Sequence, residues 1–223
     1  TVNTVLNMIK RHSAKEIEIL LRKSFDSYQT YGERFATVQQ HEAHLSFNNY
    51  VKKLEKLGYL KDGQLTEKGE FGALIYADEI ITTEVFGTDF WKKLTPYQML
   101  LTMACICFEG RRTEFRKKFP SQEMHQLKQL VKTAPYLKED KRFQHMDDLT
   151  ALFHPAFNDQ TIFEILDNSS LLEGDIIRFF RQIMDRLRQV KIASQDRDLQ
   201  DKLSLAQHKL EACLAGIDAM KGD

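Results

Sequence analysis

Hydrophobic residues recur along most of the chain at intervals of three and four, which is the spacing of one face of an α-helix. The clearest case is LLEGDIIRFFRQIMDRLRQV, residues 171–190, in which apolar and polar side chains fall on opposite sides of a helix. The apolar side consists of Ile176, Ile177, Phe180, Ile183, Met184, Leu187 and Val190. The pattern predicts a helix that packs one side into a core, and it leaves open what the polar side contacts.

Two capping boxes mark the starts of further helices. Ser13 and Glu16 form the first, and Thr95 and Gln98 form the second, which has proline at the first helical position. The first helix is expected to place Ile17, Leu20, Leu21 and Phe25 inward. The second leads into MLLTMACICF, which is apolar on nearly all sides and therefore predicts a buried helix.

The segment between these helices predicts a helix, a hairpin and another helix. A helix over about 46–57 is expected to turn one face inward, formed by Phe47, Tyr50, Val51, Leu54 and Leu57. Asp62 and Gly63 between short apolar runs predict a tight hairpin turn. A helix is then expected through FGALIYADEII, residues 71–81. This order is typical of a winged-helix unit with a small β wing.

Periodicity predicts further helices over 121–133, 140–153, 161–168 and 197–219. The expected fold is therefore mainly α, with strand limited to the one wing. We divide it into a winged-helix-like domain, residues 1–90, and a helical bundle, residues 91–223, which contains the helix 173–193.

Composition narrows the functions that the chain can have. Lys+Arg and Asp+Glu number 32 each, so any nucleic-acid surface must be a local patch. The sequence has no apolar run of membrane-spanning length and no signal peptide, which predicts a cytoplasmic protein without a membrane partner. Cys105, Cys107 and Cys213 lack the spacing of a disulfide framework, so we expect free, buried thiols in a reducing compartment.

Catalytic and metal-binding motifs are not found. GQLTEKGEFG contains glycines but lacks the Gly-Lys-Ser/Thr end that holds phosphate and magnesium. His41 and His44 are three residues apart, whereas the zinc-peptidase motif places its histidines four apart. We therefore expect no catalytic residue, no metal site and no cofactor within this chain.

The polar side of helix 173–193 is the main candidate site. Arg178, Gln182, Asp185 and Gln189 share it at spacings of four, three and four, and Arg181 flanks them. A solvated helix face usually mixes glutamate and lysine pairs. Guanidinium and amide groups can instead hydrogen-bond to base edges and stack on base faces. This side therefore suggests a nucleic-acid contact, and a merely solvated face is the alternative.

A second, weaker candidate is a basic run interleaved with Phe115 and Phe119. It consists of Arg111, Arg112, Arg116, Lys117 and Lys118. Two interpretations stay open, namely an amphipathic helix with a solvated basic face and a contact with the phosphate backbone of a nucleic acid.

Three stretches resemble one protein family. EGDIIRFFRQIMDRLRQ followed by LQDKLSLAQHKL resembles the DSHCT-type C-terminal domain of superkiller-type, exosome-associated DExH-box RNA helicases. TVNTVLNMIKRHSAKEIEILLRKSFDSYQ resembles the passage from the second RecA-like domain into the winged helix, and LEKLGYLKDGQLTEKGEFGALI resembles the winged helix itself. The resemblance implies an ATP-dependent 3′→5′ RNA helicase of superfamily 2. Its winged helix joins the motor domains to a helical bundle, in which a ratchet helix lines the RNA exit channel.

The resemblance places the ratchet helix at 173–193 and a base-contacting arginine and acid at Gln182 and Asp185. Asp185 agrees with the family, whereas Gln182 departs from it. The interval 30–45 is too short for the arch of exosome-associated members, so the resemblance is to an archless form and implies no exosome partnership.

The chain begins at Thr1 and runs at once into an apolar pattern, so we expect it to be part of a longer protein. The resemblance implies that the RecA-like domains of that protein bind ATP and magnesium. The expected partners of the chain are those domains and single-stranded RNA or DNA.

Two other functions stay open. One is a free-standing winged-helix regulator whose helix 46–57 reads a DNA major groove. That helix offers Asn48, Asn49, Lys52, Lys53 and Lys56. The other is a protein-interaction module that binds no nucleic acid.

Overall fold

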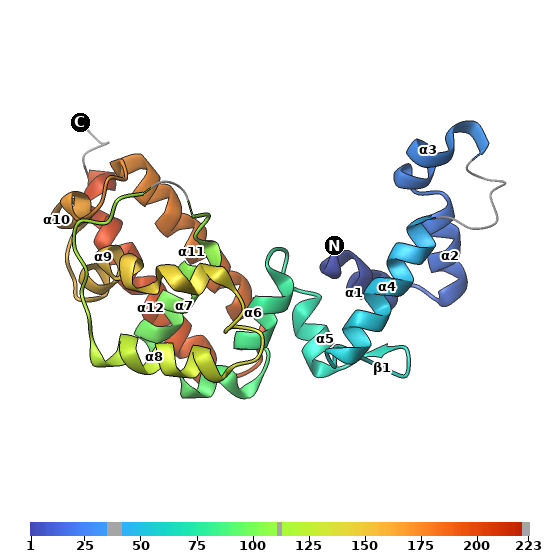
Figure 1. Ribbon diagram of the computed structural model, residues 1–223, viewed down its shortest axis with the longest axis horizontal. Helices are drawn as coiled ribbons and strands as arrows, with labels where there is room; N and C mark the ends of the chain where they lie inside the picture. The colour runs from blue at the N-terminus through green and yellow to red at the C-terminus, as the bar shows by residue number, and fades with distance from the viewer. Residues whose placement is uncertain (35–41, 111–112, 220–223) are drawn as a thin grey trace. The chain divides into compact units, whose positions relative to one another are not determined.

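A computed structural model describes residues 1–34, 42–110 and 113–219. The chain forms two compact units, Thr1–Thr83 and Glu84–Asp223 (Figure 1). Most of the described residues are helical, and their strands form one two-stranded sheet. The predicted fold class, mainly α with a small β wing, is confirmed. Among the described residues, no helix is long and apolar enough to cross a membrane.

The first unit is a small helical assembly with the wing attached. Its elements are α1 (Val2–Arg11), α2 (Ala14–Arg22), α3 (Phe25–Tyr31), the 3-10 turn η1 (Gly32–Arg34), α4 (Glu42–Lys56), β1 (Leu60–Lys61), β2 (Gln64–Leu65) and α5 (Glu67–Gly72). The core contains Val2, Val5, Leu6, Leu54, Tyr59, Leu60 and Ala73. Helix α1 therefore supplies one side of this core, and α4 with the wing supplies the other.

Helix α2 begins at the predicted capping box, in which Ser13 and Glu16 bond each other's backbone. Of the four residues predicted to face inward, Ile17 is buried, whereas Leu20 and Phe25 are 43% and 71% exposed. The inward placement of these two was wrong. The side chain of Ser24 caps a new helix that starts at Phe25, so the chain turns before Phe25 can continue the face of α2.

Helix α4 and the hairpin follow their predicted order. Leu54 is buried as predicted. The inward placement of Tyr50 was wrong, since this residue is 39% exposed. Tyrosine often keeps its polar end in solvent while its ring covers apolar surface. In the hairpin, Asp62 and Gly63 have φ of 50° and 74°, and Leu60 pairs with Leu65. Two successive positive φ values are what a two-residue hairpin of type I′ requires, so the Asp-Gly turn is confirmed.

Gly69 of α5 allows this helix to lie directly against the strand that enters the wing. A Cβ atom at this position would lie 2.1 Å from the backbone carbonyl oxygen of Tyr59. Because the obstructing atom is backbone, it cannot move aside as a flexible side chain would. The close approach of α5 to Tyr59 therefore depends on glycine.

The predicted continuous helix over 71–81 was wrong. Helix α5 ends at Gly72, and α6 (Glu79–Phe86), in which the first unit ends and the second begins, starts after a break. The Asn3 side chain donates hydrogen bonds of 2.8 Å to the carbonyls of Ala73 and Ile75, and Asp78 has a φ of 52°. Carbonyls that a continuous helix would bond internally are thus bonded by α1 instead.

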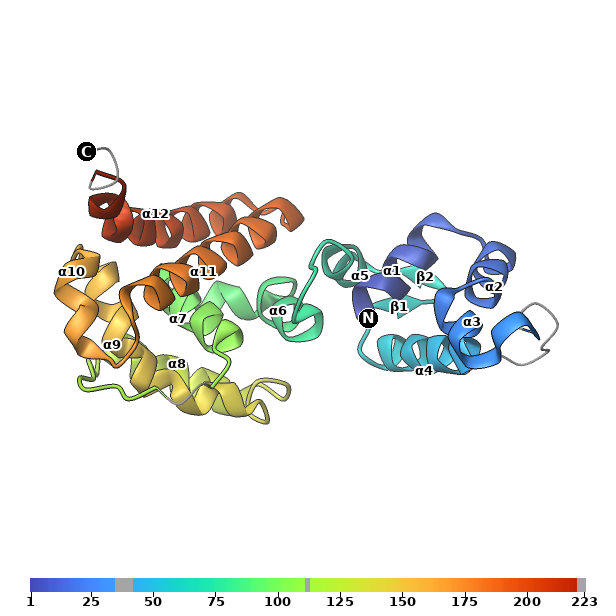
Figure 2. The ribbon, with the colours of Figure 1, turned by 90° about the horizontal axis from the view of Figure 1, so that it is seen from above.

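The second unit is a bundle around one buried helix. Its elements are η2 (Asp89–Lys93), α7 (Pro96–Cys107), α8 (Gln122–Thr133), η3 (Lys141–His145), α9 (Met146–Phe157), α10 (Ile162–Ile165), η4 (Leu166–Asn168), α11 (Glu173–Ala193) and α12 (Arg197–Ala219). Helix α7 starts at the predicted capping box, and all its residues from Tyr97 to Cys107 are buried. It packs against α9, α11 and α12 (Figure 2).

Helix α9 runs past the predicted end at 153 and contains Pro155. Proline has no backbone N–H, so the carbonyl of Ala151, four residues earlier, loses its helical partner. The buried side chain of Asn168 donates a hydrogen bond of 3.0 Å to that carbonyl. The helix can therefore continue through the proline because η4 supplies the missing donor.

Helices α11 and α12 have the predicted bounds, and they lie side by side in the bundle (Figure 2). Ile176, Phe180, Ile183, Leu187 and Val190 of α11 are buried, and Ile177 and Met184 are half-buried. The predicted apolar side is thus confirmed. The three cysteines are free and buried, and burial raises the pKa of the Cys213 thiol to about 12.

Phe180→Ala should destabilise the chain by about 3–5 kcal/mol, because the ring is fully buried and lies 5.1 Å from the ring of Phe153. Urea unfolding of wild type and variant measures this difference. Phe163→Ala is the matched control, since Phe163 is 45% exposed and should cost about 1 kcal/mol or less. Equal losses for the two variants would contradict the assigned core side of α11.

Candidate nucleic-acid interface

The polar side of α11 forms a shallow groove on the surface of the second unit. Its lining comes from α11 alone, namely Gly174, Ile177, Arg178, Arg181, Gln182, Asp185, Arg186 and Gln189. All five predicted site residues of this helix are therefore in one place. At 1.5 Å per residue, the lining extends along about 22 Å of the helix.

The predicted residues differ in how far they reach into solvent. Arg181 and Asp185 are exposed, as is Arg178, whereas Gln182 and Gln189 are half-buried. The Arg178 side chain is 67% exposed, and its guanidinium donates a 2.5 Å hydrogen bond to Asp175 one turn earlier. The Asp175 carboxylate thus holds the Arg178 guanidinium at the edge of the groove while most of that side chain stays accessible.

Arg186 is a groove residue that the sequence interpretation missed. It lies four residues after Gln182 and three before Gln189, so helical spacing alone was sufficient to find it. With Arg186 included, the groove contains three arginines and one aspartate. Asp175, which pairs with Arg178, adds a second carboxylate, so three arginines face two aspartates and one positive charge remains in excess, which favours an anionic strand.

The second candidate, the basic run, is not helical in the part that the structure describes. The Arg116 amide donates a 2.9 Å hydrogen bond to the Asn168 carbonyl, and the Ser170 amide donates one of 2.8 Å to the Glu114 carbonyl. These bonds pair the run with the segment ahead of α11, so its backbone is extended. The amphipathic-helix interpretation is wrong here, and Arg111 and Arg112 lie outside the described residues.

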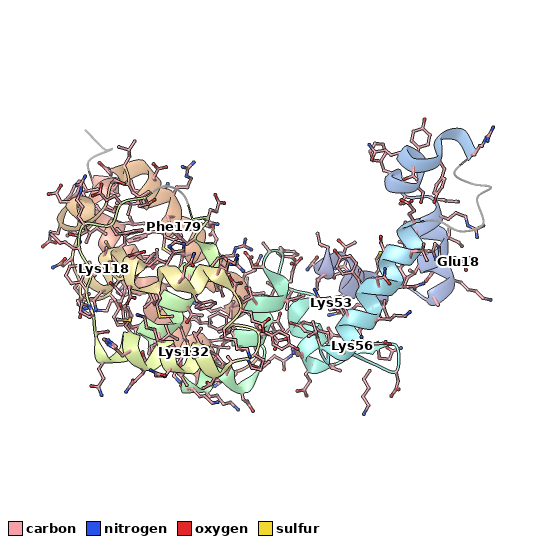
Figure 3. All side chains as sticks on the ribbon, viewed as in Figure 1. Glu18, Lys53, Lys56, Lys118, Lys132 and Phe179 are labelled. Carbon is pink, nitrogen blue, oxygen red and sulfur yellow. The ribbon has the colours of Figure 1, made fainter. Side chains whose placement is uncertain are left out.

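The phenylalanines and the cations of the basic run differ in their exposure to solvent. Phe115 and Phe119 are half-buried, whereas Arg116 and Lys118 are exposed, as is Lys117. Lys118, labelled in Figure 3, forms a 2.7 Å ion pair with Asp148, which raises the pKa of the Lys118 ammonium. Lys118 is therefore the least available of the three described cations for a phosphate contact.

A pocket lies between α11 and Thr113, which belongs to the stretch that contains the basic run. It is lined by Cys107, Phe108, Glu109, Thr113, Leu171, Asp175, Arg178, Phe179 and Gln182, and its volume is about 190 Å³. The ring of Phe108, just after α7, lies 6.0 Å from Phe115 of the basic run and 6.0 Å from Phe179 of α11. Packing thus places segments about sixty residues apart in the sequence around the same pocket.

An ion pair anchors the end of α7 beside this pocket. The Arg142 guanidinium donates a 2.7 Å hydrogen bond to the carbonyl of Ile106, and Asp140 holds the same guanidinium. Hydrogen bonds from Arg142 lower the pKa of the Asp140 carboxyl. The carbonyl end of α7, which the helix cannot satisfy by itself, is in this way bonded and fixed.

The other candidate groups do not form a site in the described part of the chain. His41 lies outside the described residues, and the described residues contain no cluster of three or more His, Cys, Asp or Glu side chains able to hold a metal ion. On α4, Lys53 and Lys56, both labelled in Figure 3, are exposed. The polar surface of α4 is therefore accessible. Asn48 of that helix lines a pocket with residues of α1 and α2, and Lys53 and Lys56 are not part of that lining.

The DSHCT (NUC185) domain family matches residues 62–211, which are 150 of the 223 residues of the chain. The chain belongs to the DSHCT domain family. DSHCT domains are found in superkiller-type helicases, so the chain is a helicase-associated domain. The matched residues include α11 and the basic run, whereas α4 precedes them.

A curated relative supports the same family. The chain is 24% identical over 227 residues to "mRNA transport homolog 4" of Caenorhabditis elegans. The similarity covers 92% of this chain and 22% of that protein. The chain with its DSHCT domain therefore spans about a fifth of the length of this relative.

Gln182→Ala combined with Asp185→Ala should change the free energy of unfolding by no more than about 0.5 kcal/mol per site, because both side chains lie on the solvent side of α11. Chemical denaturation of the DSHCT domain tests this. Leu187→Ala, on the buried side of the same helix, should cost about 2–5 kcal/mol. A double variant as unstable as Leu187→Ala would show that the polar side has a structural role.

Proposed function

We propose that this DSHCT domain is the strand-guiding part of an ATP-dependent 3′→5′ RNA helicase of superfamily 2. ATP and magnesium bind in RecA-like motor domains elsewhere in the parent protein, and the 223-residue chain itself hydrolyses no ATP. The observation that carries the proposal is the arginine- and amide-lined groove of α11, on a helix within the residues that match the DSHCT family.

The groove suits a strand that has to move. Its floor is one rigid helix whose opposite side is buried, so the polar side chains have a fixed base. Arginine can stack on base faces, and stacking tolerates any sequence, while arginine and glutamine can also hydrogen-bond to base edges. Each is worth roughly 1–3 kcal/mol, enough to resist backward slipping and weak enough to be released at the next step.

RNA is the proposed substrate. The curated relative is named for mRNA transport, and this supports RNA over DNA. We further propose that residues 1–90 are a winged-helix domain of the archless type that joins the bundle to the motor domains, in a cytoplasmic protein. On this proposal the polar surface of α4 is not a reader of DNA sequence.

The isolated chain should bind single-stranded RNA weakly and with strong dependence on salt, since only a local surface is basic. Three to five phosphate contacts predict a log–log slope of about −2 to −3.5. Fluorescence anisotropy over a range of salt concentrations measures it. Arg181→Ala and Arg186→Ala should each reduce the slope by about 0.7, whereas Lys132→Ala on the exposed side of α8 should leave it unchanged. Binding that is tight and indifferent to salt would contradict the proposal.

In the full motor, Gln182→Ala combined with Asp185→Ala should leave ATP hydrolysis measurable and lower the amount of duplex unwound per ATP, because the strand slips between power strokes. Gln182→Arg should preserve or improve this ratio, since a guanidinium stacks and donates more effectively than an amide. The measurement is unwinding amplitude against ATP consumed on one tailed duplex.

The matched control is Gln126→Ala combined with Gln129→Ala, two exposed amides on α8 that line no groove described here. This variant should keep the wild-type ratio. If the α11 double variant also keeps it, the groove does not hold the strand and its polar side is merely solvated.

A further inference from the structure

The pocket beside the α11 groove has the size of a site for one ring system. Its volume of about 190 Å³ is several times the roughly 30 Å³ share of one water molecule. It is smaller than the roughly 300 Å³ at which pockets for drug-sized ligands begin. A compact planar group matches this volume better than a drug-sized ligand does.

The lining of the pocket includes two aromatic residues, Phe108 and Phe179, each packed against a further ring. The ring centroids of Phe108 and Phe179 are 6.0 Å apart and their planes are tilted by 51°, so a planar base can lie parallel to only one of them. Phe108 is 7% exposed and Phe179 is half-buried, so Phe179 is the more accessible ring. Phe108 is supported by His145 at 5.0 Å, and Phe179, labelled in Figure 3, is supported by Phe153 at 5.5 Å. A planar ring can therefore stack on Phe179 and meet Phe108 at an angle, as aromatic groups commonly do.

The rim of the pocket is polar and continuous with the groove. Arg178 and Gln182 line both, so a strand lying along α11 passes the mouth of the pocket. Asp175, Glu109 and Thr113 complete the rim. Amide, guanidinium, hydroxyl and carboxylate groups supply donors and acceptors of the kind that pair with the edge of a base.

We propose that this pocket captures one nucleobase of the single strand, turned out of the strand's own stack. The base stacks on Phe179 with Phe108 beside it, and its polar edge faces Gln182 and Asp175. Enzymes that handle nucleic acids commonly hold a turned-out base in this way, and single-stranded RNA offers unstacked bases at little cost. The inference rests on the proposed function. A captured base would fix the position of the strand along α11, where the groove contacts alone would let the strand slide.

The test uses the 223-residue chain and a short uridine-rich RNA that contains one 2-aminopurine, whose emission reports its stacking. Leu171→Trp places an indole at the pocket, and Leu172→Trp is its matched control, because the neighbouring Leu172 is 73% exposed and lines no part of the pocket. Thr113→Trp fills the pocket from its other side and provides a second filling variant.

Wild type and Leu172→Trp should bind the RNA and shift the 2-aminopurine emission. Both filling variants should bind about 5-fold to 100-fold more weakly, the equivalent of one lost stacking contact. They should keep the salt slope of wild type, because the phosphate contacts along the groove remain. Thermal melting confirms that each variant is folded.

Two results would overturn the inference, and they differ in what they say of the proposed function. In the first, wild type binds RNA in a salt-sensitive way, but the 2-aminopurine emission does not shift or the filling variants bind as tightly as Leu172→Trp. This result would contradict the base pocket and leave the proposed strand groove unaffected. In the second, wild type does not bind RNA at all, which would contradict both the base pocket and the proposed function. If a filling variant does not fold, the shift in 2-aminopurine emission with wild type tests the base pocket by itself.

Discussion

The arrangement of the second unit depends on the burial of α7. This helix is buried along its length, so three other helices, α9, α11 and α12, must each turn an apolar side toward it. The hydrophobic effect is not directional, but a helix with one apolar side can bury that side against the core in only one rotation about its own axis. The rotation that buries Phe180 and Leu187 of α11 is the one that turns Arg181 and Asp185 outward. The polar groove is thus a consequence of the core.

A second constraint is the satisfaction of backbone groups outside the helices. The extended basic run is bonded to the segment 168–170, and the Asn168 side chain in the same segment bonds the carbonyl that Pro155 leaves without a partner. One short stretch therefore stabilises both the end of α9 and the position of the basic run. Because that stretch leads directly into α11, the basic run is held beside the N-terminal half of the groove.

The groove of α11 and the pocket beside it lie where these two constraints meet. The groove of α11 offers contacts that release easily, and the pocket at its N-terminal half offers two phenylalanine rings with a polar rim. On the proposed function, the groove contacts a moving single strand and the pocket holds one of its bases. The two share Arg178 and Gln182, so any change in one of these residues acts on both.

The sequence by itself determined the elements whose cause is local. Periodicity located α11 and its two sides, the capping box at Thr95 located α7, and the Asp62-Gly63 pair located the wing, because each depends on neighbouring residues alone. Prediction failed where distant groups compete for the backbone. Asn3 breaks the helix expected over 71–81, and the segment 168–170 draws the basic run into an extended form. The tertiary structure alone decided that Phe108, Phe115 and Phe179 meet, since no local spacing relates residues so far apart in the chain.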